Sequence, residues 1–137
     1  MQINYSNLLL ANYSLLNQLL HEKIKSSELS PGQPKVLNFL LDNNGATHKE
    51  VAAGCYLTPG ALSTILKKME KQKMIERRKE QGNNKEIHIY MTEKGKTLSK
   101  QAEEIFRELE ARAMASLSEE EKEVFMTLFE KIYLGTV

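Results

Sequence analysis

Apolar residues recur at steps of three and four along most of the chain, which is the spacing of amphipathic helices. The first such stretch, residues 3–26, predicts a long helix. Leu10 and Leu15 widen its apolar stripe beyond one face, and a helix of this kind usually packs on two neighbours. The pattern favours burial against a second subunit, with a core helix of a monomer as the alternative.

A second helix is expected near residue 30. Ser30 is its expected N-cap, Pro31 its first residue and Gln33 the partner of Ser30 in a capping box. The turn-forming run 42–45 should end this helix, and residues 46–47 offer a very short strand. The buried stripe is expected to comprise Val36, Leu37, Leu40 and Leu41.

Two short helices with a tight turn between them are predicted next. Thr47 and Glu50 form a capping box for the first, and Gly54 is expected to end it in the left-handed conformation. Thr58 should cap the second helix, with Pro59 at its first position. One face of this helix is apolar, through Leu62, Ile65, Leu66 and Met69. The opposite face is small, hydroxylated or basic, through Ala61, Ser63, Thr64, Lys67 and Lys68.

This small and basic face has the chemistry that DNA reading requires. Small side chains let a helix approach the major groove closely, hydroxyls can donate or accept at base edges and phosphates, and lysines can reach the backbone. The alternative is the solvated face of an ordinary surface helix.

A basic hairpin follows the second short helix. Residues 87–91 alternate between apolar and polar side chains, as in a half-buried strand, and residues 82–84 are typical of a turn. Between Lys67 and Lys85 there are eight basic and three acidic residues, a net charge of +5. Two helices joined by a tight turn and followed by such a hairpin predict a winged helix-turn-helix.

Two more helices are predicted after the hairpin. Thr92 should cap a long helix that runs to about Ser116, with Gly95 tolerated in its first turn. Ser118 and Glu121 form another capping box. The last helix carries a heavy apolar load, and a chain end frays unless it is docked. We expect it to dock on the first helix and on a partner's copy of both.

Composition narrows the class of protein. A chain of 137 residues suits a single compact domain or one small domain with appended helices, and its net charge of +1 does not by itself indicate a nucleic-acid partner. Residues 103–131, however, carry nine acidic and four basic residues, a net charge of −5, so the charge is polarised along the chain. The single cysteine excludes an intramolecular disulfide and fits a reducing cytoplasm. Asparagines interrupt the first apolar run, which argues against a signal peptide or membrane span.

Several motifs, each loose by itself, occur in a characteristic order. They are residues 29–33 leading into Val36-Leu37, residues 47–52, Leu57-Thr58 with residues 65–70, residues 74–78, and residues 91–95. In this order and spacing the chain resembles a MarR-type transcriptional regulator over essentially its whole length. The resemblance implies a mainly α fold with a small β wing. It places a winged helix-turn-helix DNA-binding lobe at residues 31–91 and a helical dimerisation module at residues 1–28 and 93–137.

The resemblance also implies a cytoplasmic homodimer that binds a pseudo-palindromic operator in double-stranded DNA, as a repressor and not as an enzyme. The residues it implies in DNA contacts are Thr47, His48, Pro59, Gly60, Ala61, Ser63, Thr64, Lys67, Lys68, Arg77, Arg78, Lys79 and Lys85. Many relatives carry an Asp-Arg-Arg-like run in the wing, where this chain has Asn83-Asn84-Lys85. Lysine is a poorer minor-groove probe than arginine, and the missing Asp removes an internal salt bridge that would stiffen the wing. We therefore expect a softer wing with lower sequence discrimination, and we expect Lys85→Ala to weaken all DNA sequences about equally.

Control by a small aromatic or lipophilic effector is a further implication of the resemblance. Its expected lining is Tyr5, Tyr13, His21, Val36 and Phe106. Two other functions stay open, a protein–protein interaction module and a thiol sensor acting through Cys55, although burial as a small hydrophobe accounts for that cysteine more simply. The histidines show no metal-ligand spacing and enzyme motifs are absent, so we expect neither metal nor cofactor.

Overall fold

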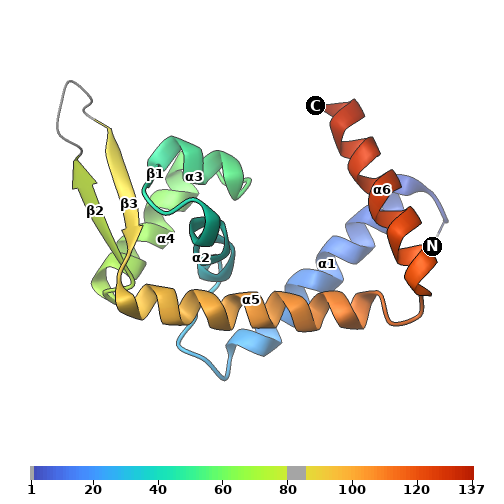
Figure 1. Ribbon diagram of the computed structural model, residues 1–137, viewed down its shortest axis with the longest axis horizontal. Coiled ribbons are helices and arrows are strands. Elements are labelled where there is room, and N and C mark those ends of the chain that lie inside the picture. Colours follow the sequence, from blue (N-terminus) through green and yellow to red (C-terminus); the bar gives the residue numbers. More distant parts are fainter. Residues whose placement is uncertain (1, 80–85) are drawn as a thin grey trace. The chain divides into compact units, whose positions relative to one another are not determined.

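The computed structural model describes residues 2–79 and 86–137. Within them it contains six helices and one three-stranded antiparallel sheet (Figure 1). The chain forms two compact units, Met1–Phe106 and Arg107–Val137. This confirms the predicted fold class, a mainly α chain with a small β wing.

The first two helices are α1 (Tyr5–Ile24) and α2 (Gln33–Asp42). α2 begins two residues later than predicted, with Gly32 and not Ser30 at its N-cap position. The reason is Pro34, because a helix starting at Pro31 would place Pro34 where its missing N–H should donate to the Ser30 carbonyl. The predicted hydrogen bond between Gln33 and Ser30 is present, since Gln33 Oε1 accepts from the Ser30 N–H at 2.9 Å. This bond closes the turn that precedes the helix and does not cap the helix itself.

The helix-turn-helix consists of α3 (His48–Gly54) and α4 (Pro59–Lys71), and the short strand β1 (Ala46–Thr47) precedes it. The capping box between Thr47 and Glu50 is present. Thr58 caps α4 as predicted, because its hydroxyl accepts from the Ala61 N–H at 3.2 Å. The start signals of both helices were therefore predicted correctly.

The end of α3 differs from the prediction. Gly54 stays helical, and Tyr56 takes the left-handed conformation instead, with φ of 56°. The Leu57 N–H then donates to the Ala52 carbonyl at 2.9 Å, which completes the helix end. Glycine serves a packing purpose at residue 54, because a Cβ there would lie 2.1 Å from the ring of Phe39 on α2.

The capping box makes one pH-dependent contribution to stability. Hydrogen bonds from the Thr47 N–H and hydroxyl lower the pKa of Glu50 below its ordinary value of 4.5. A lowered folded-state pKa stabilises the fold above the unfolded pKa, and this stabilisation is lost as pH falls through the folded pKa. Wild type should therefore unfold at a higher temperature than Glu50→Gln at neutral pH, and the difference should shrink as pH falls below 4.5. Thermal unfolding followed by circular dichroism measures this, with the exposed Glu110→Gln as the control for losing one charge.

The sheet has the order β1-β3-β2, with β2 (Ile75–Lys79) and β3 (Ile87–Met91) forming the hairpin. The predicted short strand is thus confirmed, and it pairs with the middle of β3. Ile89 and Met91 are buried as expected, but the side chain of Ile87 is 38% exposed. β1 reaches only Ile89 and His88, so Ile87 lies beyond the end of that pairing.

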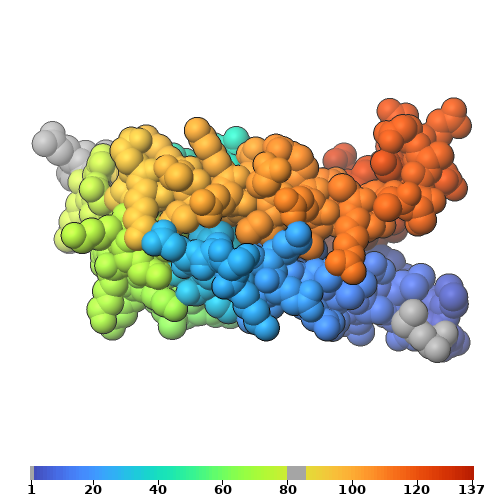
Figure 2. Space-filling view, turned by 90° about the horizontal axis from the view of Figure 1, so that it is seen from below, coloured from blue at the N-terminus to red at the C-terminus, as the bar shows by residue number. Residues whose placement is uncertain are grey.

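The core of the first unit gathers side chains from α2, α3, α4, the sheet and the first half of α5 (Glu93–Ala113). Gly95 is buried where α5 crosses the start of β2, and Thr92 Oγ1 accepts from its N–H at 3.1 Å, as predicted for the cap. The end of α1 and the segment that follows it lie beside the first turns of α5 (Figure 2), where Lys94 pairs with Glu28 at 3.6 Å.

Large apolar side chains remain exposed on both α1 and α6 (Glu119–Thr136). The capping box of Ser118 and Glu121 starts α6 as predicted. None of the side chains of α6 is buried within the chain. In the part of the chain that the structure describes, every helix is too short or too polar to cross a bilayer.

Candidate nucleic-acid interface

One face of α4 is fully exposed and carries the predicted contact residues. Its apolar residues Leu62, Leu66 and Met69 are completely buried, which fixes the rotation of the helix. The exposed residues are Pro59, Gly60, Ala61, Ser63, Thr64, Lys67 and Lys68. The front of this face is open, since a Cβ added at Gly60 would meet no atom within 4 Å. A groove of DNA could approach it closely.

The two hydroxyls of this face bond to the helix that carries them. Ser63 Oγ donates to the Pro59 carbonyl at 2.9 Å, and Thr64 Oγ1 donates to the Gly60 carbonyl at 3.3 Å. His48, the first residue of α3, places Nε2 3.1 Å from Ser63 Oγ. His48 therefore contacts the recognition face itself.

The two lysines of α4 differ in their surroundings. Lys68 Nζ donates to Ser30 Oγ at 2.8 Å, so the ammonium is held against the segment before α2. Lys67 is exposed and has no ion-pair partner among residues 2–79 and 86–137. Lys67 is consequently the freer of the two to meet a phosphate.

The basic residues at the base of the wing are mostly engaged with neighbours. Arg77, whose side chain is 29% exposed, pairs with Glu70 on α4 at 3.4 Å. Arg78 bonds to Glu76 at 2.9 Å, and its guanidinium lies 4.4 Å from the centre of the Tyr90 ring. Lys79 is exposed at the end of β2. Lys85 and the rest of the run 80–85 lie outside the described residues, so the expectations for the wing tip stay predictions.

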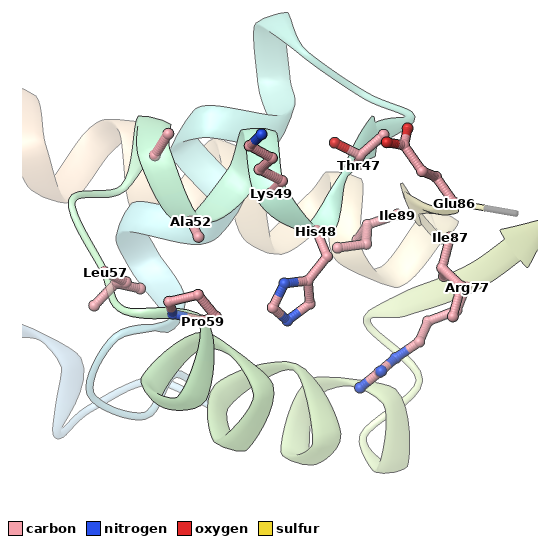
Figure 3. Close-up of a pocket in the computed structure, with 11 residues that line it drawn as sticks. Thr47, His48, Lys49, Ala52, Leu57, Pro59, Arg77, Glu86, Ile87 and Ile89 are labelled. Carbon is pink, nitrogen blue, oxygen red and sulfur yellow. The ribbon is translucent and has the colours of Figure 1, made fainter. Parts of the chain in front are cut away.

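A hollow of about 660 Å³ lies between α3, α4 and the two long strands. Figure 3 shows His48 extending from α3 across this hollow toward α4, and Arg77 extending from the strand side. Its apolar lining includes Leu57, Pro59 and Ile87. Lys49 and Ile87 also line it and were not predicted as site residues. The position of Lys49 inside the capping-box motif could have indicated that it lies beside Thr47 and His48. Ile87 could not be recognised in this way, because the regular alternation of the strand predicts it in the core.

Two predicted assignments do not fit the structure. Thr47 is only 7% exposed, and its N–H and hydroxyl both donate to Glu50, so it has no donor left for a phosphate. Val36, expected in the effector pocket, is completely buried in the core. Tyr5, Tyr13 and His21 are exposed on α1 and Phe106 is half-buried on α5. None of these expected effector residues lines the hollow beside His48.

Cys55 is a buried thiol at the end of α3. Cys55 is 3% exposed, and burial raises the pKa of its thiol to about 11. Its Sγ donates to the Lys35 carbonyl at 3.5 Å. Since the thiolate is the reactive species, this environment disfavours the thiol-sensor alternative. Among the described residues no group of three or more histidine, cysteine or acidic side chains could hold a metal ion.

Known proteins are similar to this chain in sequence and in structure. A model of the MarR family matches residues 27–85. The HTH-type transcriptional repressor Rv2887 of Mycobacterium tuberculosis (strain ATCC 25618 / H37Rv) is 28% identical over 96 residues, which cover 70% of this chain and 69% of the relative.

The solved structures share the fold over nearly the whole chain. S. aureus MepR, solved as a DNA complex, has a TM-score of 0.86 at 24% identity and covers 99% of this chain and 100% of its own. The M. tuberculosis MarR family protein Rv2887, solved with salicylic acid, has a TM-score of 0.76 at 24% identity and covers 96% of this chain and 97% of its own. The family model thus matches the segment that contains the helix-turn-helix, and the solved MarR-type structures share the fold of the chain.

Proposed function

We propose that this chain is a sequence-specific DNA-binding transcriptional regulator that acts as a repressor. The observation that carries the proposal is the exposed face of α4, where small and hydroxylated residues come first and the exposed ammonium of Lys67 follows one turn later. This is the order that a helix entering the major groove needs, with small groups near the bases and cations near the phosphates. The relative Rv2887 is a transcriptional repressor and MepR was solved with DNA, which supports the proposal.

The regulator acts as a homodimer in this proposal. The large apolar side chains of α1 and α6 are exposed in the single chain, and a second copy would remove them from water. Residues 31–91 would form the DNA-binding lobe, and residues 1–28 with 93–137 the dimerisation module. Two lobes reading half-sites about 34 Å apart match a pseudo-palindromic operator.

Salt dependence separates this function from a protein–protein module. Fragments of the source genome selected on the purified protein supply the operator, and fluorescence anisotropy then gives the affinity across a range of salt concentrations. Contacts to phosphates release counterions, so the logarithm of the affinity should fall linearly with the logarithm of the salt concentration. A chain that retains no genomic fragment at low salt would overturn the proposal. An affinity independent of salt would favour a protein partner.

The proposed effector is a small aromatic or lipophilic molecule, by analogy with Rv2887 and salicylic acid. A ligand that binds one arrangement of the lobes better than another shifts the population away from the DNA-binding one. Tyr5, Tyr13, His21 and Phe106 remain its proposed contacts. Salicylate added to the same anisotropy titration should release DNA, and unchanged binding would remove this part of the proposal.

A further inference from the structure

The hydroxyl protons of the recognition helix are already used inside the protein. Ser63 and Thr64 each donate to the carbonyl four residues earlier, at 2.9 and 3.3 Å. A hydroxyl has one proton and two lone pairs. What these side chains offer outward is therefore an acceptor oxygen, although both residues are exposed.

In the tautomer that carries its proton on Nε2, His48 stabilises this state of Ser63. Three directions are open around a serine oxygen besides its bond to Cβ. One faces the Pro59 carbonyl, which can only accept, so the proton lies there. One faces His48 Nε2 at 3.1 Å, and this contact is a hydrogen bond only if Nε2 carries a proton. The third direction is left with a lone pair.

This polarity decides which part of DNA the hydroxyls can meet. Phosphate oxygens are acceptors, so a hydroxyl that keeps its proton on a helix carbonyl cannot donate to them. In the major groove, the donors are the amino groups at adenine N6 and cytosine N4, whereas guanine and thymine place carbonyl oxygens at the corresponding positions. Lys67 and Lys68 are donors only and cannot substitute for an acceptor.

Building on the proposed DNA-binding function, we infer that Ser63 and Thr64 read the operator as acceptors of hydrogen bonds from adenine or cytosine amino groups. His48 acts as a positioning residue that keeps Ser63 in the accepting state. At the positions that face these two side chains, each half-site should carry an amino base on the contacted strand. The basic residues supply affinity for any sequence, and the hydroxyl pair supplies part of the discrimination.

Base analogues test the inference atom by atom. In the selected operator, purine replaces each adenine to remove the N6 amino group, 2-pyrimidinone replaces each cytosine to remove the N4 amino group, and 7-deazaadenine removes N7 but keeps N6. Wild type should lose roughly two- to tenfold in affinity for each contacted amino group that is removed, the usual contribution of one neutral hydrogen bond. The 7-deaza substitution at the same position should change little.

Matched variants assign the contact to a residue. Ser63→Ala and Thr64→Val remove only the hydroxyls, and each should become insensitive to the amino group that its hydroxyl contacts. His48→Ala should weaken the preference for the amino base at the Ser63 position, and His48→Gln, which keeps a side-chain N–H, should restore part of it. Thermal unfolding of each variant confirms that it is folded before its affinity is interpreted.

The outcomes separate the inference from the function on which it rests. If wild type binds no DNA, the regulator proposal fails. Two outcomes would overturn the acceptor inference and leave the regulator proposal standing. In the first, wild type binds DNA selectively, but the base positions whose preference changes in Ser63→Ala or Thr64→Val are guanine or thymine. In the second, both variants keep the full sensitivity to every amino group. The acceptor inference is supported if the hydroxyl variants lose sensitivity to an adenine or cytosine amino group and His48→Gln restores part of the preference that His48→Ala weakens.

Discussion

Gly95→Ala should lower the free energy of unfolding by about 1–3 kcal/mol, the usual effect of overpacking a filled core. A Cβ at residue 95 would lie 2.0 Å from the Met74 carbonyl oxygen and 3.3 Å from the Met91 Cβ. The obstructing atom belongs to the backbone and cannot swing aside. It is also held from both sides, because the Met74 N–H donates to Met69 and the Met74 carbonyl accepts from the Thr92 N–H at 3.0 Å.

Gly60→Ala is the matched control for this prediction. It makes the same chemical change in the first turn of another helix, where a Cβ would meet nothing within 4 Å. Alanine in place of glycine in an unobstructed helix should raise the free energy of unfolding by roughly 0.5–1 kcal/mol. Thermal unfolding of both variants at equal protomer concentration measures the difference, because the stability of a dimer depends on concentration. Shifts of the same sign for both variants would contradict the close approach of α5 to β2.

The helix starts could be predicted from the sequence because capping is local. Thr47, Thr58, Thr92 and Ser118 each act on a backbone N–H within three residues, so the residue types alone indicated the caps. The start of α2 was predicted two residues early. Pro34 is also a local signal, and it accounts for the later start of α2.

The end of α3 could not be predicted from local signals. A glycine near a helix end usually indicates the left-handed conformation, yet Gly54 is helical, and its missing side chain leaves room for the Phe39 ring of α2. Tyr56 then carries the left-handed turn, with φ of 56°. The contact between residues 39 and 54 arises only once the helices are packed, so the periodicity of neither helix indicates it.

The candidate site shows the same division between local and long-range information. Helical periodicity correctly placed Ser63, Thr64 and Lys67 on an exposed face. The partners that set their chemistry come from elsewhere in the sequence, as in the approach of His48 to Ser63 across 15 positions. The contact between Lys68 and Ser30 spans 38 positions. Exposure could therefore be predicted, whereas the direction of each hydrogen bond required the structure.

Lys67→Glu should reduce affinity for the operator on the order of 100-fold at physiological salt, because the proposed dimer would lose two phosphate contacts and gain two repulsive ones. The loss should be similar for every DNA sequence, since phosphates carry no sequence information. The slope of log affinity against log salt should also become shallower by about 1.8, from about 0.9 for each contact. Anisotropy titrations with the selected operator and with an unrelated fragment measure both quantities.

Lys100→Glu makes the same change of charge on the exposed face of α5 and isolates the effect of position. If the operator senses only the net charge of the protein, Lys67→Glu and Lys100→Glu should weaken binding equally. If α4 lies in the groove, the slope should change only for Lys67→Glu, because counterion release counts the phosphates in direct contact and long-range attraction is screened over about 8–10 Å. Equal slopes for the two variants would mean that Lys67 does not contact DNA, and the exposed face of α4 would then have to bind a partner of another kind.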